Sequence, residues 1–160
     1  MLEPVEGNGY QAGHAGLILA SYFALTGRYL IDSDDSKVEY ARRLFEAPFF
    51  VASHDGGDDP VLTYGNRTAL ELFEMGWGDF TKTPSRYTAE SPERSERERL
   101  LEAVSRQGYI DDYSGIRISK SGRRFLIRNA TVWNLIGAGG REVGQAAMFL
   151  KWEYLDDSEK

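Results

Sequence analysis

The 160-residue sequence contains no cysteine. Disulfides, thiolate metal sites and cysteine nucleophiles are therefore excluded, because each of them needs a thiol. The absence also fits a reducing compartment, and we expect a cytoplasmic protein. The length is that of one ordinary domain.

Histidine is scarce as well, since the chain has only His14 and His54. Two histidines without the i, i+4 spacing of a helical metal pair predict no metal site. We find neither a nucleophile elbow nor a phosphate-binding loop, so the sequence predicts no catalytic residue. A small single-domain enzyme, with Tyr113 or His54 in a pocket on the inner face of a sheet, stays open as the alternative.

Positive charge is in the minority, with 19 Lys and Arg against 25 Asp and Glu and a net charge of -6. Such a surface repels nucleic acid unless its cations cluster, and residues 115–125 hold the one cluster to consider. The apolar run LILASYFAL is shorter than the roughly 20 residues that cross a bilayer. We expect a partner that is neither nucleic acid nor membrane.

The first part of the chain predicts a lead-in and two helices. Residues 1–13 are Gly-rich without periodicity and are expected to be a flexible lead-in. Residues 14–47 carry two helical patterns, and the second begins at a capping box of Ser36 and Glu39. The first stripe is Ile18, Tyr22, Leu25 and Tyr29.

Residues 48–155 predict the main domain. FFVASH and VLTY form a hairpin, Asn66 caps a short helix, and a long helix follows from Ser91 to Gly108. Three strands then follow, over 109–119, 123–136 and EVGQAAMFLKWEY. The expected fold is α+β, a five-stranded antiparallel sheet with helices on one face, preceded by two N-terminal helices. Residues 156–160 are expected to be an acidic tail.

Three stretches resemble the MEKHLA domain, a PAS-related family. They are RLFEAPFFVASHDGGDDPVLTYGNRTALELF, YSGIRISKSGRRFLIRNATVWNL and GQAAMFLKW. The resemblance implies a stand-alone PAS-like sensory or protein-interaction module rather than an enzyme. It further implies a small ligand, an unknown protein partner or a homodimer.

The same resemblance raises the question of cofactors. A flavin that forms a cysteine adduct and a cysteine-linked chromophore are excluded because cysteine is absent. Haem is not expected, because the long helix over 92–107 has no histidine. A noncovalent flavin or a small metabolite stays open.

Strict alternation along strand 123–136 puts Phe125, Ile127, Asn129, Thr131 and Trp133 on one face, which we expect to line the core. Polar side chains on such a face either bond to the backbone or to a tyrosine, or they orient a ligand; both interpretations stay open. The small residues around position 146 leave space for a ligand or for a closely packed helix. The predicted ligand site is Tyr64, Tyr113, Asn129, Thr131, Trp133 and Gln145.

The arginines of the cluster at 115–125 are expected on the outer face. Alternation separates Arg117 from Ile116 and Ile118 and places Arg117 and Arg128 opposite the core. There they either cover apolar residues with their stems or pair with acids of the N-terminal helices or of a partner. We expect a ligand or partner at the inner face to alter self-association through the N-terminal helices.

Overall fold

The computed structural model describes residues 1–31 and 36–155, apart from the side chains of residues 91–93. The acidic tail expected at 156–160 lies outside the described residues. The helices are η1 (Glu6–Gln11), α1 (Ala12–Thr26), α2 (Lys37–Glu46), α3 (Arg67–Phe73), α4 (Trp77–Phe80), η2 (Ser85–Thr88), α5 (Ser91–Gln107) and η3 (Ala138–Gly140). The strands are β1 (Phe50–Asp55), β2 (Leu62–Gly65), β3 (Tyr109–Ile118), β4 (Arg124–Ile136), β5 (Glu142–Phe149) and β6 (Lys151–Tyr154).

The two N-terminal helices follow the local signals closely. Gly27 ends α1 in a left-handed conformation, with φ 73°, and its N–H donates to the Phe23 carbonyl at 2.8 Å. The predicted stripe therefore stops before Tyr29, which lies outside the helix. At the start of α2, the Ser36 side chain accepts from the Glu39 N–H at 3.3 Å, which is one of the two bonds of the predicted capping box. The Glu39 carboxylate pairs with Arg42 and Arg43.

The sheet is antiparallel in the order β2-β1-β5-β4-β3, and β6 pairs with β4. It therefore has six strands rather than five, because the expected last strand is divided at Leu150. β5 and β6 keep one register against β4, with Met148 opposite Thr131 and Lys151 opposite Arg128. The predicted α+β fold is confirmed. The break between β5 and β6 changes the number of strands but not their pairing with β4.

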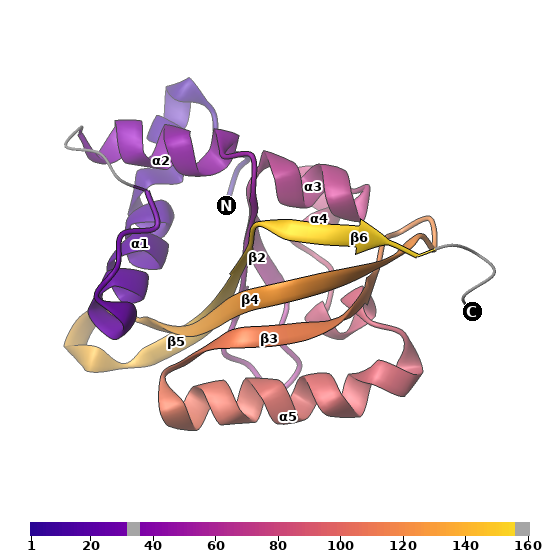
Figure 1. The fold of residues 1–160 in the computed structure, drawn as a ribbon. Helices are drawn as coiled ribbons and strands as arrows, with labels where there is room; N and C mark the ends of the chain where they lie inside the picture. Colours follow the sequence, from indigo (N-terminus) through magenta and orange to yellow (C-terminus); the bar gives the residue numbers. More distant parts are fainter. Residues whose placement is uncertain (32–35, 156–160) are drawn as a thin grey trace.

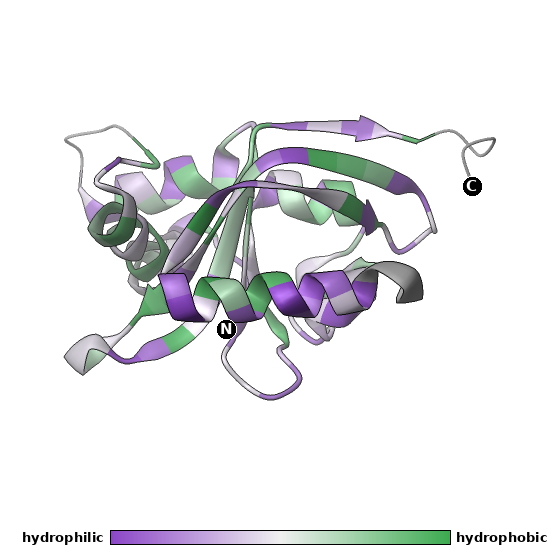
Figure 2. Cartoon of the chain, turned by 60° about the horizontal axis from the view of Figure 1, so that its bottom comes forward, coloured by the Kyte–Doolittle hydropathy of each residue, from purple (hydrophilic) through white to green (hydrophobic). Residues whose placement is uncertain are grey.

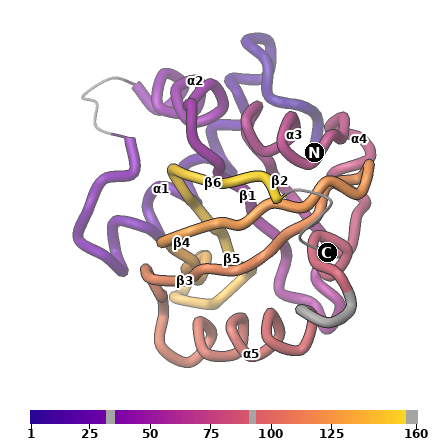
Figure 3. The backbone as a smooth tube through the Cα atoms, turned by 45° about the vertical axis from the view of Figure 1, so that its right-hand side comes forward, coloured from indigo at the N-terminus to yellow at the C-terminus, as the bar shows by residue number. Residues whose placement is uncertain are grey.

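Helices lie on both faces of this sheet (Figure 1; Figure 3). We call the face toward α3 and α5 the inner face, and the face toward α1 the outer face. On the outer face, Trp133 Nε1 donates to the Ile18 carbonyl at 3.3 Å, and the Ile136 N–H donates to Ser21 Oγ at 2.9 Å. On the inner side, hydrophobic residues of α5 gather in the second half of the helix (Figure 2). Both sheet faces are therefore core.

An extra residue interrupts the pleat of β4 at Asn129. The φ of Asn129 is 53°. The pairing passes from Gly115–Ile127 to Tyr113–Ala130, so β4 advances three residues where β3 advances two. This is a β-bulge with a left-handed residue, a conformation that asparagine tolerates better than most side chains. The division between β5 and β6 falls opposite this point.

The bulge corrects the expected faces of β4. Before it, Phe125 and Ile127 point inward as predicted, and Phe125 lies 5.6 Å from Phe73 of α3 between ring centroids. After it, alternation is reversed, so Ala130 and Val132 point inward. Thr131 and Trp133 are therefore on the outer face, and the prediction that they share the face of Phe125 is wrong.

The placement of Arg117 is also corrected. Arg117 is opposite Phe125 in the β3–β4 pair and points inward, while Ile116 and Ile118 are half-buried on the outer face. The more apolar side of β3 is expected to face the core. On this edge strand the rule fails, because Ile116 and Ile118 are partly covered on the outer face as well. Arg128 is exposed on the outer side, as expected, and it pairs with Glu153 of β6 at 3.4 Å rather than with an N-terminal helix.

The bulge predicts an unusual tolerance at position 129. Asn129→Gly should leave the free energy of unfolding within about 0.5 kcal/mol, whereas Asn129→Val should lower it by about 1–2 kcal/mol, because a β-branched residue is strained at φ 53°. Urea denaturation measures both. Arg128→Val, in extended backbone next door, is the control and should change little. Equal tolerance of valine at 128 and 129 would contradict the assigned bulge.

Candidate functional site

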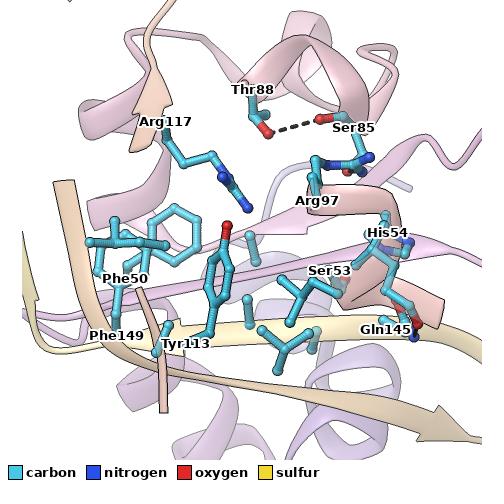
Figure 4. A pocket seen from close by; sticks show the side chains of 18 of the residues that line it. Phe50, Ser53, His54, Ser85, Thr88, Arg97, Tyr113, Arg117, Gln145 and Phe149 are labelled. Atoms are coloured by element: carbon cyan, nitrogen blue, oxygen red, sulfur yellow. Dashed lines mark hydrogen bonds between the residues drawn. The ribbon is translucent and has the colours of Figure 1, made fainter. Parts of the chain in front are cut away.

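A cavity of about 90 Å³ lies between the inner face of the sheet, η2 and α5 (Figure 4). The walls come from β1, β3, β4 and β5, and α5 closes it with Arg97, Leu100 and Leu101. η2 adds Ser85 and Thr88. The volume exceeds the roughly 10–15 Å³ that one water needs, but it is far below the roughly 300–1,000 Å³ of pockets for drug-sized ligands.

One part of the cavity is apolar and aromatic. Phe50 of β1 stacks on Phe149 of β5 with ring centroids 4.2 Å apart, and Phe73 of α3 meets Phe50 edge-on at 5.6 Å. Ile127 and Val132 of β4 complete this part. Such surfaces favour an apolar group over water.

A polar row crosses the inner face next to the apolar part. His54, Gln145 and Asn134 are paired across β1, β5 and β4. Gln145 Nε2 donates to Asn134 Oδ1 at 3.1 Å and to the Leu101 carbonyl at 3.0 Å, and Asn134 Nδ2 donates to the Val104 carbonyl at 3.0 Å. The two amides thus fasten α5 to the sheet.

One ring nitrogen of His54 has a hydrogen-bond partner, and the other has none among the described residues. Its Nδ1 lies 2.7 Å from the Asp55 carbonyl, which can only accept, so Nδ1 carries the proton. Burial lowers the pKa of His54, so the ring is neutral near pH 7. Its Nε2 is then an acceptor, and this buried atom has no partner among the described residues.

The other end of the cavity is cationic. Arg97 of α5 is buried and donates to Ser85 Oγ, while the Thr88 hydroxyl donates to the Ser85 carbonyl at 2.8 Å. The Cζ of Arg117 lies 5.3 Å from the centroid of the Tyr113 ring. In Figure 4 the Arg117 guanidinium points toward the Tyr113 hydroxyl, while the Arg97 guanidinium lies beside Ser85. No Asp or Glu is among the described residues that line it.

The structure brings together two of the six residues predicted to bind a ligand. Tyr113 and Gln145 line the cavity. Asn129 is exposed at the bulge, and Thr131 and Trp133 are buried on the outer face, so their expected position on the inner face is corrected. The cause is the reversed alternation of β4.

Tyr64 is on the outer face too. It is opposite Ser53 in the β1–β2 pair, and its ring lies 5.7 Å from His14 of α1 and 5.8 Å from Trp77 of α4. Its hydroxyl is buried and has no partner among the described residues. Burial raises the pKa of Tyr64, so the phenol is neutral.

Sequence reasoning missed the cationic end. One signal was available: Arg97 is on the same helical stripe as Leu100, Leu101 and Val104, at spacings of three, four and seven. An arginine on the apolar stripe of a helix is either paired or placed in a cavity. Ala146 and Ala147 line the cavity, and α5 packs beside them, with the Leu101 carbonyl accepting from Gln145. Both predicted uses of the space, a ligand and a closely packed helix, therefore stay open.

Comparisons with known proteins agree with this geometry. The family model of the MEKHLA domain matches residues 12–154. Comparison with curated proteins found no match. A PAS domain from Colwellia psychrerythraea is similar with TM-score 0.59 at 14% identity, covering 76% of this chain and 97% of that chain.

Two further solved structures share the fold. A fungal LOV domain photoreceptor has TM-score 0.59 at 14% identity, covering 88% of this chain and 94% of that one. The PAS domain of a LuxR-family transcriptional regulator from Burkholderia thailandensis, in complex with ethanol, has TM-score 0.53 at 19% identity, covering 72% and 96%. At these identities the likeness establishes a PAS fold and nothing about ligands.

The described residues contain neither a metal-binding cluster nor a membrane-spanning helix. Among residues 1–31 and 36–155 no group of three His, Asp or Glu side chains is close enough to hold a metal ion. Within the same residues, none of the helices has the length and apolar character needed to cross a membrane.

The two buried histidines predict a pH dependence. Burial lowers the pKa of both His14 and His54 below 6.5, so the unfolded chain binds more protons than the folded one below that pH. The free energy of unfolding should therefore fall as pH drops from about 6.5 to 5, by at most about 1.4 kcal/mol per pH unit for each histidine. Urea denaturation across this range measures it. His54→Gln should reduce the slope, and an unchanged slope in the variant would contradict the assigned burial.

Proposed function

This chain belongs to the MEKHLA domain family, and from that membership and its PAS fold we propose that it is a sensory module. A small molecule binds in the cavity between β-sheet and α5, and its binding alters how the N-terminal helices associate. The observation that carries the proposal is the cavity itself, whose lining combines an apolar aromatic part with the two cations Arg97 and Arg117.

Size limits the ligand. A volume of about 90 Å³ suits a molecule of a few non-hydrogen atoms. Ethanol, which one of the similar PAS domains contains, is of that size. A flavin, the subject of another similar structure, does not fit, because its fused rings need a drug-sized pocket and the sequence has no cysteine for an adduct.

The polar groups of the cavity support binding over catalysis. General acid–base chemistry needs a group that exchanges a proton near neutral pH, commonly oriented by a carboxylate. His54 is held by a backbone carbonyl, and the described lining contains no Asp or Glu. Hydrogen-bonding groups that do not activate one another suit recognition of a ligand better than catalysis.

Adjacent residues of β4 link the cavity to α1. Val132 lines the cavity, and the next residue, Trp133, packs under α1 with its ring 4.9 Å from that of Tyr22. Trp133 also donates to the Ile18 carbonyl. A ligand that displaces Val132 shifts Trp133 through the shared backbone, so α1 is the element that responds.

The exposed side of this helical layer supports self-association as the output. Phe23 and Tyr29 are 42% and 67% exposed, and their rings stack 4.6 Å apart. They border an apolar groove with Leu19, Leu30 and Tyr40. Two adjacent exposed aromatic rings are a surface that a second copy of the chain would cover.

Native mass spectrometry tests the binding step. Protein purified without denaturation should carry a retained small mass, or else gain thermal stability with members of a library of small metabolites. Ala147→Val, which adds two methyl groups to the cavity wall, should abolish the gain while changing the unfolding free energy by less than about 1.5 kcal/mol. Ala24→Val, exposed on α1, should keep it. The proposal would be wrong if the mass spectrum showed only the protein and no member of the library raised its thermal stability.

Light scattering tests the output step. The wild type should form a dimer whose dissociation constant changes when a small-molecule extract of lysate is added. Phe23→Ser with Tyr29→Ser should weaken the dimer at least about tenfold, because these aromatic residues would supply its buried area. Tyr87→Ser, 50% exposed elsewhere, is the control and should not. A monomer at every concentration, with and without extract, would remove the output step.

A further inference from the structure

Arg97 is a buried cation without a buried anion. Only 5% of the residue is exposed, and its one hydrogen bond among the described residues goes to the neutral hydroxyl of Ser85. The ion pairs of the described residues do not include it. A charge taken out of water in this way is costly unless a counter-charge is supplied.

The charge persists despite that cost. Burial, and secondarily the nearby positive charge of Arg117, lower the pKa of Arg97 to about 10. This is still well above neutral pH, so the guanidinium stays protonated. Folding therefore keeps a full positive charge at the wall of the cavity.

Arg117 adds a second positive charge at the same end. Its Nη1 donates to the Ile116 carbonyl at 3.0 Å, and its guanidinium lies against the Tyr113 ring, so its partners are neutral as well. The two like charges repel each other, and this repulsion adds to burial in lowering the pKa of Arg97. Glu98 and Asp59 act on Arg97 in the opposite sense, but neither carboxylate lines the cavity. The missing group is an anion.

The rest of the cavity limits what that anion can be. The guanidinium fork matches the two oxygens of a carboxylate or of a phosphate. Beyond it, the walls are Phe50, Phe149, Ile127 and Val132, which an inorganic ion would leave facing water. An apolar body attached to the anionic head satisfies both ends.

We propose that the ligand of this cavity is a small monocarboxylate with a short apolar body, its carboxylate bound by Arg97 and Arg117. This inference rests on the proposed function, since it names the chemical class of the ligand that the sensory module binds. The head lies at the α5 end, between the two guanidinium groups and the Tyr113 hydroxyl. The body lies against the paired rings of Phe50 and Phe149.

Calorimetric titration of the full chain tests the proposal. The probes are straight-chain carboxylates from acetate to hexanoate, the neutral analogues 1-butanol and butyramide, and inorganic phosphate. The carboxylates of best-fitting length should bind at least about tenfold more tightly than the neutral analogues and than phosphate. Arg97→Gln should remove that preference.

Two controls separate loss of binding from loss of folding. Arg99→Gln changes the same charge on an exposed position of α5 and should leave carboxylate affinity unchanged. Arg97→Gln removes an uncompensated buried charge, so its thermal midpoint without ligand should equal or exceed that of the wild type. A lower midpoint would show that the cation stabilises the apo fold and would overturn the inference.

The remaining outcomes separate failure of the carboxylate assignment from failure of the proposed sensory function. Neutral analogues that bind as tightly as carboxylates, or an Arg97→Gln variant with unchanged carboxylate affinity, would overturn the carboxylate assignment and leave the sensory module standing. Phosphate binding as tightly as any carboxylate would replace it by an inorganic anion. Failure of every probe, together with a clean apo mass and no library response, would overturn both.

Discussion

One left-handed residue decides which side of the sheet the second half of β4 serves. Without the extra residue at Asn129, strict alternation would carry Trp133 into the cavity and Val132 under α1. An indole of that size would fill the space that a ligand needs. With the bulge, small residues face inward and the large ring faces α1. The cavity and the binding surface of the N-terminal helix therefore have a common cause.

The attachment of α1 is polar as well as apolar, which makes the helix a separable element. Three contacts hold it to the outer face: His14 to Ser53 at 3.0 Å, Trp133 to Ile18 and Ile136 to Ser21. Each one joins α1 to a strand of the central sheet and uses at least one side chain. A net hydrogen bond contributes about 1 kcal/mol, so modest shifts in β1 or β4 change the occupancy of this attachment. A packed apolar face alone would tolerate such shifts.

The sequence predicts what is local and fails where a single residue changes register. Helix ends, caps and the positions of the strands along the chain follow from periodicity and from residues such as Ser36, Gly27 and Asn66. Asn66 caps α3 as predicted, but its amide also reaches the Leu44 and Phe49 carbonyls, which no local pattern indicates. The bulge was not predicted because one asparagine in a strand carries no distinctive signal. Thr131 and Trp133, downstream of the bulge, were misplaced for that reason. Arg117 was misplaced for another reason, because the isoleucines beside it on an edge strand are half-buried on the outer face.

In the proposed function, the buried charge of Arg97 is what would let a small ligand act on the whole domain. A ligand shifts a conformational equilibrium only by its difference in affinity for the two states. The affinity of a neutral molecule for an apolar cavity differs little between two conformations of the domain. A carboxylate between Arg97 and Arg117 gains strongly only where both guanidinium groups face it, so its affinity depends on how α5 and β3 are placed. Asn134 and Gln145 bond α5 to β4 and β5, and β4 continues into the Trp133 contact with α1. The charge that weakens the empty domain is thus the group through which ligand binding becomes sensitive to its shape.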